Sequence, residues 1–181
     1  MLVSWDGYTA YSSDGSSWHR GSTDLNRGYS SNWLGCVWTG SYFVALNRFN
    51  KVGYSSDGIN WTCTAPSPIY SGCMDDGFCY DTDLSRLFIT ADDRTWITSA
   101  QDGMSGWTSN YRGNMSFPLC DGQRWEYGKG YYVAYSNSSI KYGSNGTSTS
   151  SSDWKSVSLP ASVNCICYGV GIFWGLTSAG K

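Results

Sequence analysis

Two kinds of side chain in this 181-residue chain have spacings that could support chemistry, namely paired carboxylates and recurring cysteines. Paired carboxylates hydrolyse glycosides when one acts as an acid and the other as a base or nucleophile. The acidic doublets are Asp75-Asp76 and Asp92-Asp93. Both fall in predicted turns, where aspartate is expected because its side chain accepts hydrogen bonds from nearby backbone amides. We therefore predict structural acids at these positions and no catalytic residue.

The chain holds seven cysteines, and four of them recur at intervals close to a repeat length: Cys36, Cys73, Cys120 and Cys165. Four thiolates could bind zinc tetrahedrally. However, no Cys-x-x-Cys pair is present, Cys165-Ile-Cys167 is shorter than a usual zinc knuckle, and Cys63 falls outside the set. An odd cysteine count without a secretion signal favours reduced thiols. We predict thiols packed in the interior, with no metal and no cofactor, and metal analysis would decide between the two interpretations.

One stretch of sequence occurs four times and organises the whole chain. Each copy has an aromatic or apolar start, a turn with Ser, Asp or Asn and Gly, and then a Trp, over Tyr11–Trp18, Tyr54–Trp61, Thr98–Trp107 and Tyr142–Trp154. The Asp accepts turn amides, the Gly takes a positive φ, and the Trp buries about 150–250 Å². We call each copy a clamp and predict a structural role for its residues: Asp14, Gly15, Trp18, Asp57, Gly58, Trp61, Asp102, Gly103, Trp107 and Trp154.

The spacing of the clamps predicts the architecture. Successive clamp tryptophans are 43, 46 and 47 residues apart, and the two chain ends together make one further repeat. Repeats of about 40–50 residues with strand and turn signals are typical of propeller blades. We predict one all-β domain, residues 1–181, that forms a four-bladed β-propeller closed by pairing of N- and C-terminal strands. The blades are expected at 161–181 plus 1–20, 32–65, 70–110 and 118–158.

Strand signals within these blades alternate with turn signals. The expected strands cover 34–38, 42–46, 51–55, 61–65, 71–80, 86–91, 95–99, 107–110, 124–127, 131–135, 139–142, 154–158, 163–168 and 172–176. One apolar stretch, Leu2–Trp5, gives the split blade one strand more than the scheme needs. The Gly/Ser/Thr-rich stretch 143–152 is predicted to be a mobile turn tip.

Composition excludes several classes of protein. Aromatic residues make up 17% of the chain and charged residues only 14%, which favours a turn-rich β protein over a helical one. A net charge of −2 and dispersed Lys and Arg argue against nucleic-acid binding. No apolar run is long enough for a membrane span, and the start does not resemble a signal peptide, so we expect a protein made in the cytoplasm. The lone His19 is expected to be solvated.

The clamp resembles the Asp-box, or BNR repeat, of sialidase-like β-propellers, whose pattern is Ser-x-Asp-x-Gly-x-x-Trp. Asp14 and Asp57 each precede their Trp by four residues, one fewer than in the family, and the fourth copy lacks the turn carboxylate. The resemblance implies hairpins between the third and fourth strands of a blade, away from any catalytic face. The short form is similar to repeats of bacteriophage virion proteins. The arginines of this chain lie at non-equivalent blade positions, unlike those that a sialidase needs.

The turns between second and third strands, with the connections between blades, are predicted to form a recognition face. It gathers polar residues suited to a glycan or a flat protein surface: Arg48, Asn50, Asp92, Asp93, Arg94 and Asn137. A solvated face without a ligand is the alternative. We expect a non-enzymatic structural or recognition module, a bacteriophage virion component for capsid decoration, tail or fibre, with other virion proteins and a host-surface glycan as partners. A lectin-like protein, a small glycosidase and a cytoplasmic location remain alternatives.

Overall fold

The structure is a computed structural model, and it describes residues 1–22, 25, 32–47, 49, 51–65, 78–90, 94–111, 124–136, 139–146, 148 and 150–177. These residues form an all-β protein with one short 3-10 helix, η1 (Ser151–Asp153). The strands are β1 (Leu2–Val3), β2 (Thr9–Tyr11), β3 (His19–Arg20), β4 (Trp33–Trp38), β5 (Phe43–Asn47), β6 (Val52–Ser55), β7 (Thr62–Thr64), β8 (Phe78–Asp81), β9 (Arg86–Thr90), β10 (Arg94–Thr98), β11 (Thr108–Tyr111), β12 (Arg124–Gly128), β13 (Tyr131–Ser136), β14 (Ser139–Gly143), β15 (Lys155–Ser158), β16 (Val163–Gly169) and β17 (Ile172–Thr177).

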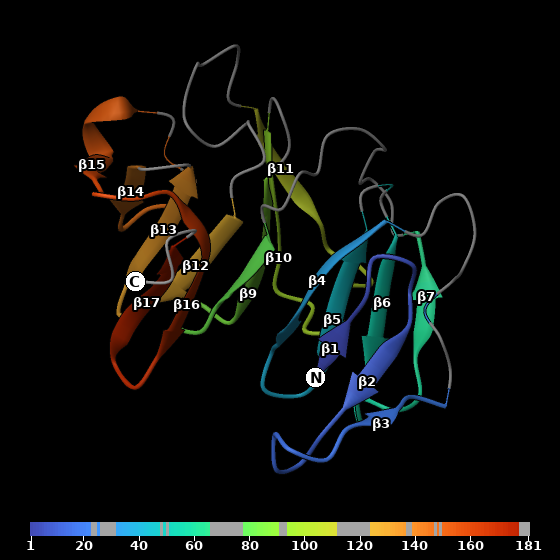
Figure 1. Ribbon diagram of the computed structural model, residues 1–181. Coiled ribbons are helices and arrows are strands. Elements are labelled where there is room, and N and C mark those ends of the chain that lie inside the picture. Colours follow the sequence, from blue (N-terminus) through green and yellow to red (C-terminus); the bar gives the residue numbers. More distant parts are fainter. Residues whose placement is uncertain are drawn as a thin grey trace.

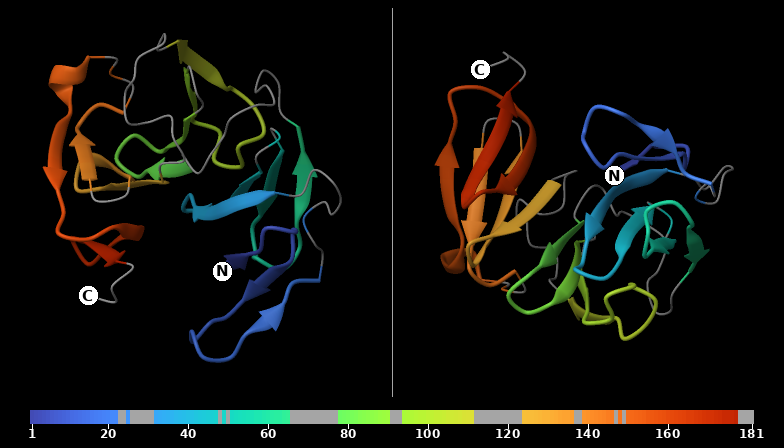
Figure 2. Two further views of the ribbon diagram at one scale, coloured as in Figure 1. Left: turned by 45° about the horizontal axis from the view of Figure 1, so that its top comes forward. Right: turned by 90° about the horizontal axis from the view of Figure 1, so that it is seen from below.

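The strands form five antiparallel sheets in chain order (Figure 1). We name them the N-terminal sheet (β1–β3), the first sheet (β4–β7), the second sheet (β8–β11), the third sheet (β12–β15) and the C-terminal pair (β16–β17). Each of the three four-stranded sheets is a meander in which every strand pairs with the next one. Figure 2 shows the sheets around an open arc, with the N-terminal sheet and the C-terminal pair at its two ends.

The predicted strands in residues 33–65 and 124–158 are confirmed to within one or two residues. Short hairpins join the first and second strands of each meander, and their corners use positive φ at Gly40 and at Lys129-Gly130. The buried strands are near-continuous apolar or aromatic runs, as in β5, where Val44 to Asn47 are all buried, because a sheet covered on both faces buries successive side chains. In the predicted mobile stretch, the described residues 151–153 form η1.

The core consists of three apolar clusters that lie between neighbouring sheets. One joins the first and second sheets through Val44, Leu46, Leu87 and Ile89, together with Trp107. Another joins the second and third sheets through Phe88 and the aromatic residues of β12 and β13. The last packs Met1 and Val3 of the N-terminal sheet against a cluster that includes Trp33 and Trp61. Burial therefore holds the N-terminal sheet to the first sheet, the first sheet to the second, and the second to the third.

The predicted pairing of the two chain ends is not found among the described residues. β2 pairs with β1 on one side and with β3 on the other, while β16 and β17 form a separate sheet. The reason is the extra apolar stretch, since Leu2–Val3 forms the strand that occupies the inner edge of β2. The ring that the repeat spacing predicts is thus open in the part of the chain that the structure describes.

Candidate functional site

The clamps are built by short-range hydrogen bonds. In the second clamp, Asp57 Oδ1 accepts the backbone N–H groups of Ile59 and Asn60 at 2.7 and 2.8 Å, and Ser55 Oγ accepts that of Gly58 at 2.9 Å. The Trp61 indole N–H donates to the carbonyl of Gly58 at 3.3 Å. These backbone donors hold the pKa of Asp57 well below its usual range, since they favour the charged carboxylate.

The first clamp repeats this geometry and the third varies it. Asp14 Oδ1 accepts two backbone N–H groups at 2.8 Å each, and bonds from Ser17 and Ser16 lower its pKa likewise. In the third clamp, Asp102 accepts the N–H of Met104 at 3.0 Å, and the Trp107 indole donates to Gly103 at 2.8 Å. The clamp glycines 15, 58 and 103 all have positive φ, as predicted. The clamps therefore stabilise the tight turns in which they lie.

Burial separates the clamp tryptophans into two groups. Trp61, Trp107 and Trp154 are only 8%, 5% and 7% exposed, whereas Trp18 is 44% exposed. The prediction that every clamp tryptophan is buried is therefore wrong for Trp18. Its hairpin belongs to the N-terminal sheet, which has no sheet packed on its outer side in the described residues.

The predicted recognition face lies almost wholly outside the described residues. This applies to Arg48, Asn50, Asp92, Asp93 and Asn137. Arg94 begins β10, but its side chain is outside the described set. The acidic doublet Asp75-Asp76 and two of the recurring cysteines, Cys73 and Cys120, also lie outside it. The recognition face thus stays a prediction.

A buried polar network that the sequence did not signal lies between the second and third sheets. Asp81, at the end of β8, accepts the backbone N–H groups of residues 83 and 84 at 3.1 and 3.0 Å. Its other oxygen accepts Arg86 Nε at 3.2 Å and the hydroxyl of Tyr132. Arg86 Nη2 donates to that hydroxyl at 2.8 Å, and Tyr127 donates to Asp83 at 2.7 Å. The network ties the β8–β9 hairpin to β12 and β13.

The electrostatics of this network disfavour nucleophilic chemistry. Burial, followed by the hydrogen bond to Asp81, raises the pKa of Tyr132 well above its usual range. Burial and the bond to Asp83 do the same for Tyr127. A phenolate nucleophile needs the opposite shift. The tyrosines lie 44 to 51 positions from their partners on the β8–β9 hairpin, so no local motif could have identified these pairs.

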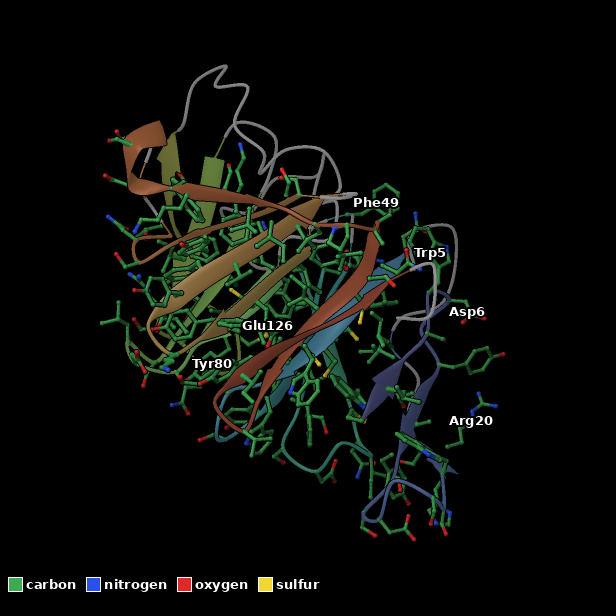
Figure 3. All side chains as sticks on the ribbon, turned by 60° about the vertical axis from the view of Figure 1, so that its left-hand side comes forward. Trp5, Asp6, Arg20, Phe49, Tyr80 and Glu126 are labelled. Atoms are coloured by element: carbon green, nitrogen blue, oxygen red, sulfur yellow. The ribbon has the colours of Figure 1, made fainter. Side chains whose placement is uncertain are left out.

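Glu126 on β12 is the other perturbed acid. Its carboxyl lies in the interior of the arc, beside β16, while Trp5, Asp6 and Arg20 lie on the projecting N-terminal sheet (Figure 3). Burial raises the pKa of Glu126 to about 7, and a hydrogen bond from the backbone of Tyr168 offsets part of that effect. A carboxyl group with this pKa can hold a proton near neutral pH, and its charge contributes, after burial, to the raised pKa of the buried Cys79 thiol.

The described cysteines and the histidine do not form a set of metal ligands. Cys36, Cys165 and Cys167 lie on the inner strands β4 and β16, and burial raises the pKa of Cys36 to about 12. Among the residues that the structure describes, no group of three or more His, Cys, Asp or Glu is placed to hold a metal ion. His19 is exposed, with its ring 5.5 Å from that of Tyr11.

Apolar side chains are exposed at the C-terminal end of the arc. Trp174 and Leu176 of β17 are 56% and 67% exposed, and Ile172 is exposed beside them. Within residues 1–177 as described, β17 pairs with β16 alone. Edge strands with apolar side chains normally mark a contact surface, because natural proteins otherwise protect such edges.

No family model matches the chain, and no curated protein matches it. No helix in the described segments is long and apolar enough to cross a membrane. The proposal below therefore depends on the geometry and on the resemblance of the clamps.

Proposed function

We propose that this protein is a non-enzymatic structural or recognition module built on a four-bladed β-propeller plan. The first, second and third sheets are three blades, and the C-terminal pair with β2 and β3 supplies the two halves of the fourth. One observation carries the non-enzymatic part of the proposal. Among the described residues, the polar network around Asp81 bonds to itself, because both carboxylate oxygens of Asp81 accept hydrogen bonds from donors within the protein.

The exposed features support assembly or recognition. Catalytic sites need acids and bases with pKa values matched to their task, and the shifted tyrosines of this chain move away from that range. The exposed apolar edge of β17 is instead suited to contact with another strand, from this chain or from a partner protein.

The short-turn clamps support a more specific placement, as a bacteriophage virion component that decorates a capsid, tail or fibre. In that setting the partners are other virion proteins, and the polar face with Arg48, Asn50, Asp92, Asp93, Arg94 and Asn137 touches a host-surface glycan. The clamps carry this placement by resemblance, and fold alone does not imply function.

Gene context and particle composition test this proposal. We expect capsid or tail genes next to the gene for this protein, and peptides of this chain in purified particles at a fixed ratio to the major capsid or tail protein. A metabolic gene neighbourhood together with absence from particles would refute the virion placement.

A glycan array separates the recognition variants. Reproducible binding that weakens in Arg94→Ala and Arg48→Ala, but not in an Arg20→Ala control on the N-terminal sheet, would support the glycan-binding face. Hydrolysis of sialosides or other glycosides, lost on changing Asp92 or Asp93, would refute the non-enzymatic proposal.

A further inference from the structure

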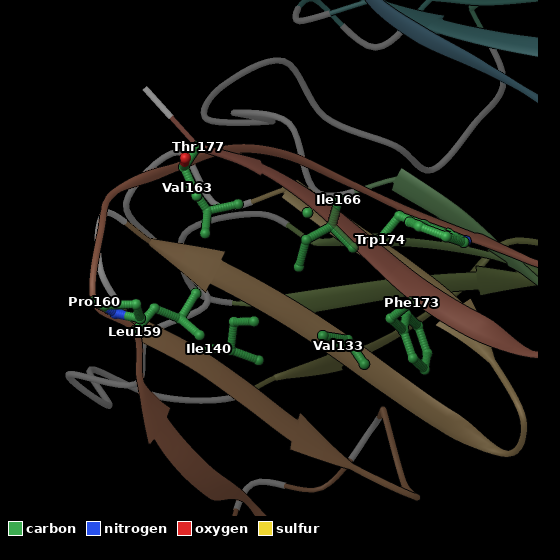
Figure 4. A pocket seen from close by; sticks show the side chains of 10 residues that line it. Val133, Ile140, Leu159, Pro160, Val163, Ile166, Phe173, Trp174 and Thr177 are labelled. Carbon is green, nitrogen blue, oxygen red and sulfur yellow. The ribbon is translucent and has the colours of Figure 1, made fainter. Parts of the chain in front are cut away.

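A pocket of about 290 Å³ lies between the third sheet and the C-terminal pair (Figure 4). Val133 of β13 and Ile140 of β14 point into it from one side, and Val163, Ile166 and Phe173 from the other. No charged side chain lines this pocket. An apolar pocket next to an open sheet edge favours an occupant that brings both an apolar side chain and a strand.

The other clamps show what fills this space between neighbouring sheets. Two of the buried clamp tryptophans, Trp107 and Trp154, lie in clusters that their own sheet shares with the preceding one. Trp107 of the second sheet lies in a cluster with Val44 and Val52 of the first, and Trp154 in one with Phe88 of the second. By the same rule, the Trp18 clamp should pack against the third sheet, which is at the other end of the arc.

Strand register identifies the residues of the third sheet against which the Trp18 clamp would pack. When each sheet is aligned on its own clamp, the residues of β13 and β14 pair in the same register as those of β5 and β6. Val133 and Ile140 therefore take the places that Val44 and Val52 hold in the first sheet. Val44 and Val52 are covered by the next clamp, whereas Val133 and Ile140 line the pocket.

The surroundings of the clamp glycines indicate independently that the Trp18 clamp, unlike the others, is not packed against a preceding sheet. A Cβ added at Gly103 would come within 3.1 Å of Val52 and 3.3 Å of Val44, so this turn is seated directly on the preceding sheet. One added at Gly146 would meet Phe88 at 2.8 Å. For Gly15, no heavy atom of the described residues comes within 4 Å of that position, its chain neighbours aside.

The C-terminal pair shows the register in which a third strand would join it. β16–β17 has a register shift between Val163 and Cys165, and β4–β5 has one at the matching place, between Trp33 and Gly35. Aligned on this shift, β17 corresponds to β5. Because β5 pairs with β6 in the first sheet, β17 should pair with β2, the strand that leads into the Trp18 clamp.

That alignment specifies one central pair. Ala45 of β5 faces Gly53 of β6, and the matching residues are Gly175 of β17 and Ala10 of β2. At present Ala10 is paired with Leu2 of β1. β1, only two residues long, thus occupies the edge of β2 that matches β17.

We propose that the pocket is the seat of the Trp18 clamp of the same chain. In this rearrangement, β2 gives up its pairing with β1 and pairs with β17 instead, and the whole β2–β3 hairpin, residues 9–20, moves with it. The Trp18 indole then lies between Val133 and Ile166. The exchange replaces a two-residue partner with a longer strand and covers Trp18 and Trp174. The chain's own hairpin is preferred to that of a second copy because a tethered segment has a high effective concentration. This inference rests on the four-blade plan proposed above, but not on the virion placement.

A disulfide trap tests the exchange. We expect the pair Ala10→Cys with Gly175→Cys to form a link within one chain under mild oxidation, found by peptide mapping with mass spectrometry, which separates it from links to native cysteines. The control pair, Ala10→Cys with Ile172→Cys, lies three residues out of register, about 10 Å along the strand, and should give several-fold less link. Equal yields from both pairs, or no link from either, would overturn the proposal.

Two further arms identify the occupant. Adding Trp18→Ala to the trapped pair should lower the yield several-fold, while Trp5→Ala, also exposed but outside any clamp, should leave it unchanged. An unchanged yield in the Trp18 variant would overturn the assignment of the pocket. A link found only between two chains would overturn the same-chain assignment and identify a second copy instead. None of these results alters the gene-context test, so failure of the exchange and failure of the virion placement are distinguishable.

Discussion

The substitution Tyr132→Phe tests the buried network with a single-atom change. The Tyr132 hydroxyl donates to Asp81 and accepts from Arg86, and all three groups lie between the second and third sheets. Asp81 is 0% exposed and Tyr132 is 1% exposed, so water cannot replace the lost hydroxyl without a rearrangement. A hydrogen bond to a charged group is worth about 1.5–3 kcal/mol, and we expect a loss of unfolding free energy in this range.

The neighbouring residue gives a matched control. Tyr131 is 44% exposed and contacts the ring of Tyr142 at the surface, so Tyr131→Phe should change stability by no more than about 0.5 kcal/mol. Urea unfolding followed by tryptophan fluorescence and far-UV circular dichroism measures both variants under the same conditions. If Tyr132→Phe and Tyr131→Phe were equally stable, the network would not hold the two sheets together, and the reasoning would be refuted.

Three further predictions concern the ionisation of Glu126, the packing of a clamp glycine and the burial of a clamp tryptophan. Because the pKa of Glu126 is raised to about 7, its carboxyl stabilises the fold fully below about pH 4.5 and loses that contribution as pH rises to about 7. Partial solvent exposure reduces the effect to about 1–2 kcal/mol, and Glu126→Gln should remove this pH dependence from urea midpoints measured between pH 4.5 and 8. Gly103→Ala should destabilise more than Gly15→Ala, since both positions have positive φ but only Gly103 is packed against a neighbouring sheet; equal thermal midpoints would contradict this seating. Trp61→Ala should cost about 3–5 kcal/mol, against a much smaller loss for the half-exposed Trp38→Ala, and similar values from chemical unfolding would contradict the assigned burial.

The sequence could predict most of the strands and the turn geometry of the clamps because these depend on neighbours in the chain. Asp57 accepts amides two and three residues ahead, and the clamp glycines adopt their positive φ within the same turn. The apolar and aromatic runs of β5 and β13 and the regular spacing of the clamp tryptophans likewise identify strands and sheets in order. The closed ring, in contrast, was inferred from repeat arithmetic, which carries no information on which strand takes a particular edge.

Three features were decided by tertiary structure. Leu2–Val3 pairs with β2, and this excludes β17 from the same edge. Trp18 has the same clamp sequence and local bonds as Trp61, yet it stays exposed because no sheet covers it among the described residues. Asp81 and Tyr132 meet across 51 residues of chain. The hydrogen bonds of a turn join neighbouring residues and can therefore be predicted from the sequence. The partner of a strand edge, the sheet that covers a tryptophan and the members of a buried network depend instead on which distant parts of the chain pack together.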